Sequence, residues 1–496
     1  MTEKIFEAIR EEEDVRKNLI QLRSILKSQP ELIKEIDEDR KDLLVDLLSS
    51  EDAKTRKNAA LILGLLKDQE LLSVLLYAYR HEEKLFIRGD YLDAISCLDY
   101  SPVLDDLKKS LDMIEKTDLT EENRKHLLSE ARTLRDMISR KEPHKKHRFT
   151  GWKKQSDMVL VVSPGMEDLC LNDLPREDCT GIRRGKGAVF LRTGALRRVL
   201  CLRTVKSFLF CFCANPLAGR KADEIAKEVL AGGIVDFLDE RHESQNGPYY
   251  FRIDMYSHMV LEEKSRFVSR LAAGIESGSA GRLVNSVSDY ELTIRLNENK
   301  AGAFSVYIQL ETIEDKRFAY RKQAIATSLN PVRAAEICST ASGYLAGDAA
   351  VLDPFCGTGT LLIERNMRRR AKYLYGVDVY GQAVNMARQN AKVSGTDIFF
   401  INKDCLEFSH RYLFDEIITE LPAAGGKMTR PELTRLYRGL AGRIGDWLKK
   451  GGYAIICTSQ PEILLAALKR AGSIRVEQVR QLSGKRGDTI VICQLQ

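Results

Sequence analysis

Long hydrophobic runs are missing from this sequence of 496 residues. No stretch of 18 or more consecutive apolar residues occurs, so a membrane-spanning helix is not expected. The first seven residues are acidic and amphipathic, which does not match a secretory leader. The 11 cysteines contain no C-x-x-C pair and are scattered through apolar segments. This usage predicts buried free thiols, no zinc site and a reducing, cytoplasmic environment.

Glycine is absent from the first 63 residues, and segment 1–139 has a strongly helical pattern that repeats. The run R-K-N-L-I-Q-L that begins at Arg16 aligns with R-K-N-A-A-L-I at Arg56, and a further offset of 32 residues places Arg88 over Arg56. Repeats of this length predict an all-α solenoid, and the run at Arg56 resembles a HEAT repeat. Such an array can hold a protein or RNA, or it can simply cap the next domain.

A basic segment, residues 140–156, follows the helical region. Pro143, Gly151 and a dense positive run predict a linker. Phe149 and Trp152 lie among its lysines, so a contact in which the rings stack on RNA bases is as compatible with the sequence as a solvated hinge.

Strand patterns begin beyond this linker. Residues 157–219 read as strand, helix, strand, helix, strand, which predicts a small α+β unit of ferredoxin-like type. In residues 220–315, helical patterns alternate with strands, and the strand at 290–296 alternates apolar and polar side chains, so one of its faces is expected to be solvated.

The most informative stretch is a predicted strand that runs through Asp353 into a glycine loop and then a helix. Gly357 and Gly359 allow the backbone to approach a ligand at the carboxyl edge of the strand. A dinucleotide fingerprint requires a third glycine where this chain has Leu362. The next predicted strand ends in Asp378, an acid placed to bind a ribose diol. Two glycines and these two acids favour S-adenosylmethionine over NAD.

The block D-P-F-C-G-T-G-T-L-L-I-E, residues 353–364, resembles class I S-adenosylmethionine-dependent methyltransferases, in the subset that modifies RNA and carries a THUMP domain. The resemblance implies S-adenosylmethionine as the cofactor, no metal, and tRNA or rRNA as the partner. It also implies a ferredoxin-like module over 157–219, a THUMP-like RNA-binding domain over 220–315 and a Rossmann-like α/β methyltransferase with a seven-strand sheet over 316–496. The expected fold is therefore multidomain: solenoid, α+β region, then α/β domain. A protein partner on the solenoid is a further expectation.

The resemblance implies a set of cofactor-binding residues. The S-L-N-P segment would cover the methionine side of the cofactor, and acids at the ends of the second and third strands would bind the ribose and the adenine amine. The residues after those two acids would sandwich the adenine. The candidates are Ser328, Asn330, Pro331, Asp353, Phe355, Gly357, Gly359, Thr360, Asp378, Val379, Asp404 and Cys405.

The fourth strand leads into Glu420-Leu421-Pro422-Ala423. Methyltransferases of this type that act on amines carry D-L-P-F-G or N-P-P-Y here, where the acid or amide orients the target amine and the ring stacks on the flipped base. Glu420 and Pro422 are therefore the candidate catalytic residues, with the exocyclic amine of guanine as the expected target. Ala423 replaces the stacking ring.

Three readings of this site remain open. Glu420 holds a guanine amine while another ring, such as Phe355, supplies the stack. Alternatively, the chain is a methyltransferase-like RNA-binding or scaffold protein with little or no turnover. In the third reading, Cys457 attacks a pyrimidine ring, as in 5-methylcytosine enzymes. Separately, the arginines at 365 and 368–370 are expected to form a solvated helix end that complements the helix dipole.

Overall fold

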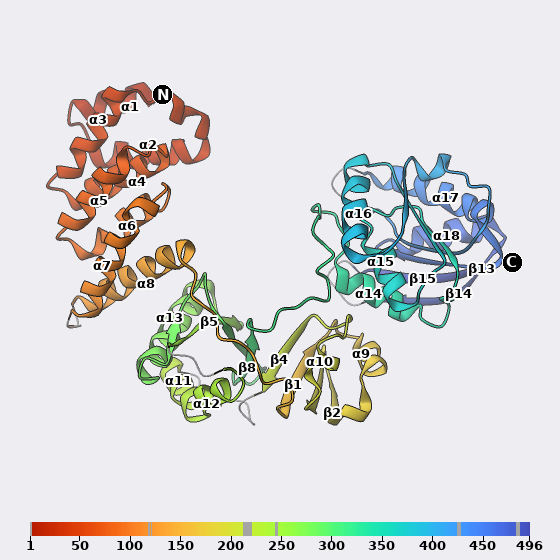
Figure 1. The fold of residues 1–496 in the computed structure, drawn as a ribbon. Coiled ribbons are helices and arrows are strands. Elements are labelled where there is room, and N and C mark those ends of the chain that lie inside the picture. Colours follow the sequence, from red (N-terminus) through yellow and green to blue (C-terminus); the bar gives the residue numbers. More distant parts are fainter. Residues whose placement is uncertain are drawn as a thin grey trace. The chain divides into compact units, whose positions relative to one another are not determined.

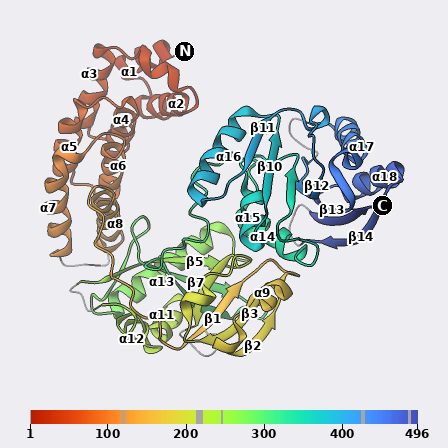
Figure 2. The same cartoon turned by 45° about the vertical axis from the view of Figure 1, so that its right-hand side comes forward.

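The computed structural model describes residues 2–117, 120, 122–211, 221–243, 247–423, 428–482 and 487–496. Figure 1 and Figure 2 trace the chain from the N-terminus to the C-terminus. Its contacts divide it into two compact units. The first contains Met1–His147, Gly247–Arg252 and Ala280–Glu291, and the second contains Arg148–Asn246, Ile253–Ser279 and Leu292–Gln496. Among the described residues, no helix is both long and apolar enough to cross a membrane.

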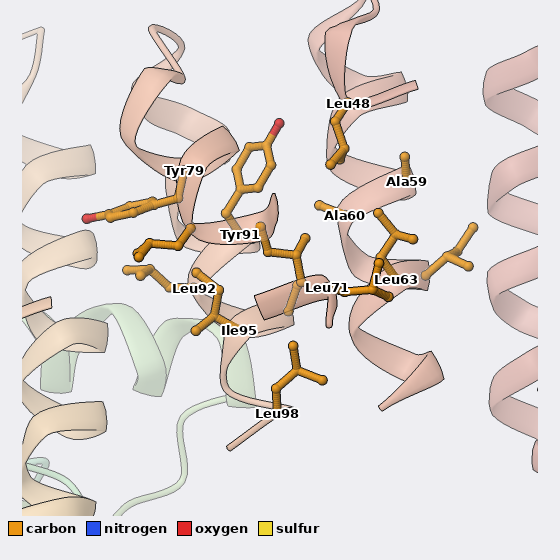
Figure 3. Close-up of a cluster of buried hydrophobic side chains, with 14 of the residues drawn as sticks. Leu48, Ala59, Ala60, Leu63, Leu71, Tyr79, Tyr91, Leu92, Ile95 and Leu98 are labelled. Carbon is orange, nitrogen blue, oxygen red and sulfur yellow. The ribbon is translucent and has the colours of Figure 1, made fainter. Parts of the chain in front are cut away.

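The first unit is helical up to residue 141, and the described part of this range contains no strand. Its helices are α1 (Thr2–Arg10), α2 (Val15–Ser28), α3 (Glu38–Asp46), α4 (Ala53–Leu66), α5 (Leu71–His81), α6 (Leu85–Ile95), α7 (Leu104–Glu115) and α8 (Arg124–Lys141). Helix α2 packs on α4, α4 on α6 and α6 on α8. Apolar side chains at helical spacing, among them Leu63, Tyr79 and Ile95, fill one continuous core between them (Figure 3).

Two arginines that the sequence aligns at an offset of 32 residues make the same kind of contact. Arg56 donates from Nε and Nη2 to the carboxylate of Glu82 at 2.8 and 2.7 Å. Arg88 donates from Nε to Oε1 of Glu130 at 2.8 Å. Both glutamates are buried, and each also accepts a hydrogen bond from a tyrosine hydroxyl. The sequence repeat therefore corresponds to a repeated arginine–glutamate–tyrosine contact in the structure. Its assignment to the HEAT class stays a prediction.

The basic segment is more ordered than a solvated hinge. In the first unit, His147 is buried and its Nδ1 lies 2.8 Å from Glu291 Oε1, while the ring of His144 stacks on Tyr250. In the second unit, Phe149 is 5% exposed and packs edge-on against Trp152. Of the two readings left open for this segment, stacking of Phe149 on RNA bases does not fit the structure, because its ring is already enclosed by protein.

The α+β part of the second unit contains a sheet in which strands follow the order β2-β3-β1-β4-β8-β7. Their bounds are β1 (Ser156–Val161), β2 (Cys179–Gly185), β3 (Ala188–Thr193), β4 (Ser207–Cys211), β7 (Leu292–Glu298) and β8 (Phe304–Leu310). The helices are α9 (Glu167–Asp173), α10 (Leu196–Val199), α11 (Ala222–Ala231), α12 (Ile234–Asp239) and α13 (Leu261–Gly278). Within the first unit, β5 (Tyr249–Tyr256) begins by pairing in parallel with β6 (Leu283–Asn285).

The sequence pattern missed strand β2. Among the described strands, it lies at the edge of its sheet and pairs with β3 alone. Its residues are mostly polar or glycine, and Arg183 and Arg184 are exposed, so the apolar alternation that reveals a strand is absent. The predicted boundary at 219–220 lies outside the described residues.

The C-terminal part of the second unit is a sheet of seven strands in the order β11-β10-β9-β12-β13-β15-β14, and β15 is antiparallel to both of its neighbours. The strands are β9 (Ala350–Asp353), β10 (Tyr373–Asp378), β11 (Phe399–Asn402), β12 (Phe414–Glu420), β13 (Leu448–Thr458), β14 (Ile474–Gln481) and β15 (Thr489–Leu495). The helices are α14 (Pro331–Thr340), α15 (Thr360–Arg368), α16 (Gly381–Ser394), α17 (Arg430–Trp447) and α18 (Pro461–Ala471). Helices α14, α15 and α16 cover one face and α17 and α18 the other, each over its own apolar core (Figure 2). This is the predicted Rossmann-like arrangement.

The expectation of a solvated basic end of helix α15 fails for Arg365. This side chain is fully buried, and its Nε and Nη2 donate to the carboxylate of Glu416 on strand β12 at 2.9 and 2.7 Å. Nη2 also donates to the carbonyl of Ala346 at 2.8 Å. The pair ties α15 to the central strand of the sheet, whereas Arg368, Arg369 and Arg370 are exposed as expected.

Candidate functional site

The glycine loop joins β9 to α15 at the carboxyl edge of the sheet. Gly357 and Gly359 both have positive φ, at +51° and +78°. A Cβ on Gly359 would come within 3.0 Å of Phe400 Cζ, and one on Gly376 of the neighbouring strand would lie 2.8 Å from Phe400 Cδ1. A Cβ on Gly357 would meet no atom within 4 Å. The loop therefore packs tightly on the Phe400 side and leaves open space over Gly357, where a ligand can approach the backbone.

Three predicted acids influence one another at this edge. Asp353 is 1% exposed and accepts hydrogen bonds from Thr419 Oγ1 at 2.7 Å and from the Phe355 amide at 3.0 Å. The pKa of Asp353 is raised to about 7, mainly by burial, and the charges of Asp378 and Glu420 contribute to this rise. A cation such as a sulfonium or an ammonium group would relieve this mutual repulsion. The ends of β9, β10 and β12 thus form an acidic site for a positively charged ligand.

Asp378 also organises the loop itself. Its Oδ2 accepts the Gly357 amide and its Oδ1 the Tyr380 amide, both at 2.8 Å. Beyond it, Val379 is 73% exposed and Tyr380 is 50% exposed, so their side chains are available to a bound molecule. Tyr380 was missed by the sequence reasoning, although its place after the strand-ending acid is the signal that could have found it.

Other predicted cofactor residues follow strand β11 or contact the glycine loop. Asp404 follows β11 and accepts the Leu406 amide at 2.8 Å, and the next residue, Cys405, is buried. Ser328 Oγ lies 3.1 Å from Thr358 Oγ1 in the loop. Thr360 Oγ1 is buried and has no hydrogen-bond partner among the described residues.

Asn330 and Pro331 have a structural role in the described contacts. The Asn330 side chain accepts the amides of Val332 and Arg333 and so caps helix α14, and Pro331 is the first residue of that helix. This is the N-terminal helix signal that the sequence contains. Their contribution to cofactor binding stays a prediction.

Strand β12 carries the candidate catalytic motif to the same edge. Glu420 is its last residue, and the Leu421 amide after it donates to the Cys457 carbonyl at 2.8 Å. The Pro422 carbonyl accepts a hydrogen bond from Tyr437 Oη at 2.8 Å, and Ala423 is exposed. The rest of the predicted motif, residues 424–427, lies outside the described residues. Tyr437, which fixes the backbone of the motif, could not be found from sequence because it comes from helix α17.

The reading in which Cys457 is a nucleophile is wrong. This side chain is 1% exposed within strand β13, and burial raises the pKa of its thiol well above the usual range. A thiol that stays protonated and enclosed cannot attack a pyrimidine ring.

A substitution at Gly357 tests the open space above the loop. Gly357→Ala is expected to weaken S-adenosylmethionine binding about tenfold or more, because the new methyl group enters the space for the ligand. Gly395→Ala is the matched control: Gly395 also has positive φ (+67°) and open space around its Cβ, but it ends helix α16. Both variants carry a similar backbone strain of about 1–2 kcal/mol. Isothermal titration of each variant would contradict the assignment if both lost affinity equally.

The pKa of Asp353 predicts how cofactor binding depends on pH. The carboxyl group is mainly neutral at pH 6 and mainly ionised at pH 8, because its pKa is about 7. Affinity for a cationic cofactor is therefore expected to rise about tenfold from pH 6 to pH 8 and to fall again on acidification. Asp353→Asn should flatten this dependence, and Asp397→Asn, at an exposed carboxylate, should retain it. A flat profile for the unmodified protein would contradict the assignment.

Comparison with known protein families matches residues 319–491 to the family described as RMKL-like, methyltransferase domain. A tRNA (guanine(10)-N2)-dimethyltransferase of Methanothermobacter thermautotrophicus is 26% identical over 263 residues, which are 49% of this chain and 73% of that protein. An uncharacterized RNA methyltransferase of Clostridium tetani is 34% identical over 139 residues, 28% of this chain and 29% of that protein.

Two solved structures share the fold. TrmN from Thermus thermophilus has a TM-score of 0.54 and 20% identity, with 68% of this chain and 99% of that chain covered. A putative methyltransferase complexed with SAH has a TM-score of 0.53 and 15% identity, with 69% and 98% covered. The prediction of a methyltransferase is confirmed for residues 319–491, and so is its Rossmann-like sheet.

Proposed function

We propose that this protein transfers the methyl group of S-adenosylmethionine to a base nitrogen of tRNA or rRNA, with the exocyclic amine of guanine as the acceptor. The observation that carries this proposal is the convergence of Asp353, Asp378 and Glu420 at the carboxyl edge of a sheet that matches a methyltransferase family. The relative named as a tRNA guanine-N2 dimethyltransferase supports the choice of acceptor.

The residues at this edge fit such a cofactor. The acids supply negative charge for the sulfonium and ammonium groups, and the open space over Gly357 lets the ligand meet the loop. We assign the ribose hydroxyls to Asp378 and the adenine amine to Asp404, as the resemblance implies. When bound, the cofactor supplies an electrophilic methyl group whose departure leaves a neutral thioether.

The role of this chain is mainly to position the acceptor. Glu420 would accept a hydrogen bond from the guanine amine, direct the nitrogen lone pair toward the methyl group and take up the proton that the amine loses. The Tyr437 hydroxyl would hold the following backbone in place through the Pro422 carbonyl. Such orientation is the main requirement of an in-line transfer with a good leaving group.

The part before the methyltransferase domain would hold the RNA. On strands β2 and β3 the side chains of Arg183, Arg184 and Arg192 are exposed, and Lys186 lies in the turn between them. Arg184 already pairs with Glu167 and Asp168, and Arg192 with Asp157. Arg183 and Lys186 would therefore make the main contacts with the phosphate backbone. The THUMP-like assignment of residues 220–315 and a protein partner on the helical region belong to this proposal.

A catalytically weak protein that binds RNA is the second candidate. It is favoured by Ala423, which is exposed at the position where the resemblance implies a stacking ring. Glu420 is also one methylene longer than the aspartate of the usual motif, which shifts its carboxylate.

Introducing an aromatic ring at position 423 distinguishes a protein that stacks poorly on the base from one that cannot catalyse methyl transfer. Ala423→Phe is expected to raise kcat/KM for RNA roughly 5- to 150-fold, because stacking on one base contributes about 1–3 kcal/mol. Ala423→Leu adds similar bulk without an aromatic face and should give a much smaller gain. Equal effects of the two substitutions would contradict a stacking deficit.

The direct test is transfer of labelled methyl from S-adenosylmethionine to RNA isolated from cells that lack this protein. Incorporation into one RNA fraction, at a guanine identified by nucleoside mass spectrometry, is the expected result. If no fraction accepts methyl groups while the cofactor binds tightly, the RNA-binding alternative replaces the enzyme.

A further inference from the structure

A cluster of polar side chains around the buried Glu364 joins three segments that are far apart in sequence. Arg203 donates from Nε and Nη2 to the two carboxylate oxygens of Glu364, both at 2.6 Å. Tyr320 Oη donates to Glu364 Oε1, also at 2.6 Å. Glu364 is 1% exposed and Tyr320 is 4% exposed. Glu364 is the last residue of the sequence block 353–364 that contains the glycine loop, and its carboxylate is engaged by this cluster.

The cluster connects the ferredoxin-like part to the cofactor loop within the second unit. Arg203 lies between helix α10 and strand β4, and Glu364 lies on α15, five residues after Gly359. Met166 of the ferredoxin-like part also packs in the same apolar core as Ile337 of helix α14. The ferredoxin-like part is thus docked against the helix that begins at the cofactor loop.

The chain segment of residues 317–328, which we call the approach segment, also connects the ferredoxin-like part to the cofactor loop. At its start, Arg317 donates to the carbonyls of Leu202 and Val205, and the guanidinium of Arg203 lies over the Phe318 ring. The approach segment is therefore held on the residues that flank Arg203.

Its far end is held on the cofactor loop. The Gln323 amide donates to Asn390 Oδ1 at 3.0 Å, and Asn390 Nδ2 donates to the carbonyls of Gln323 and Thr358 at 2.9 and 3.1 Å. Asn390 is fully buried. Ser328 completes the attachment through its contact with Thr358 Oγ1. The approach segment thus has one end on the ferredoxin-like part and the other on the loop.

We propose that Arg203, Glu364 and Tyr320 are positioning residues that couple RNA binding to cofactor binding. The inference rests on the proposed function, because it takes the α+β region to be the RNA-binding part. Glu364 is buried and the side chain of Arg203 is 26% exposed. Such an ion pair adds little net stability compared with apolar residues of the same size, so we assign its role to the geometry that it fixes. A bidentate arginine fixes that geometry more strictly than a lysine can.

Cofactor affinity measured with and without RNA tests the coupling. For the unmodified protein, saturating total tRNA is expected to change the Kd for S-adenosylmethionine about fivefold or more. Arg203→Lys should keep the affinity for either ligand alone within about twofold. The ratio of the Kd for S-adenosylmethionine without RNA to that with RNA should then be close to one. Arg475→Lys, at an exposed arginine that pairs with Glu477 on strand β14, is the matched control and should keep the coupling.

Tyr320→Phe removes one hydrogen bond and no charge, so it provides a second variant if Arg203→Lys does not fold. It is expected to reduce the coupling partially. An unmodified protein without coupling, or an Arg203→Lys or Tyr320→Phe variant with full coupling, would overturn the inference. Coupling without methyl transfer to any RNA would count against the proposed reaction only, because both readouts are binding affinities.

Discussion

Replacing Glu420 with alanine is expected to lower the rate of methyl transfer about a hundredfold or more while changing the affinity for S-adenosylmethionine little. Glu420 ends strand β12 at the edge of the sheet that carries the cofactor loop, and it is the one acid of the usual motif that this chain keeps. Without its carboxylate, the guanine amine loses the acceptor that orients its lone pair. Misplacement of a reacting atom by about 1 Å can cost about a hundredfold.

Three variants make this test specific. Glu420→Gln keeps a hydrogen-bond acceptor and should retain more activity than Glu420→Ala. Glu420→Asp introduces the acid found in the usual motif and should be at least as active as the unmodified protein. Glu477→Ala removes an exposed carboxylate from strand β14 and should have no effect. Single-turnover rates at saturating cofactor provide the measurement, and full activity of Glu420→Ala would remove this residue from the reaction.

Replacing Arg365 with methionine is expected to cost about 3–5 kcal/mol of folding free energy. The substitution leaves Glu416 as a buried carboxylate without its only arginine partner in the described structure, and burial already raises the pKa of that carboxyl group. The transition that belongs to this domain can be identified in a thermal melt as the one that S-adenosylmethionine shifts upward.

The double variant Arg365→Met/Glu416→Leu separates the cost of an unpaired charge from the value of the pair. It replaces both charges by apolar groups, so it should recover most of the lost stability. Arg370→Met, at an exposed position of the same basic run, should change stability by less than about 0.5 kcal/mol. If the double variant were as unstable as Arg365→Met, the loss of folding free energy would come from altered side-chain packing and not from an unpaired charge.

The parts of the fold that the sequence predicted are those with local signals. The glycine loop, the acid at Asp378 and the cap at Asn330 each depend on residues within a few positions of one another, and the seven-strand sheet follows from regular alternation of strands and helices. Edge strand β2 was missed because an edge position does not require an apolar stripe.

The parts that the sequence could not predict depend on partners that are distant along the chain. Arg365 and Arg370 belong to one basic run, yet only Arg365 is buried, because Glu416 comes to it from strand β12, 51 residues later. His147 lies in a segment that reads as a hinge, yet its partner Glu291 is 144 residues away. The sequence gives the residue type but not its partner. A buried, paired arginine and a solvated one are therefore distinguished only by the folded structure.

The paired charges on helix α15 restrict the movement of that helix. Its neighbouring residues Glu364 and Arg365 point about 100° apart around the helix axis, as in any α-helix, and each meets a bidentate partner on a different side. Rotation or sliding of the helix would break at least one of these ion pairs. We therefore expect amide hydrogens in α15 to exchange with solvent very slowly even in the free protein. The cofactor would then bind to a loop whose helix is already immobile, and only the ligand would lose freedom on binding.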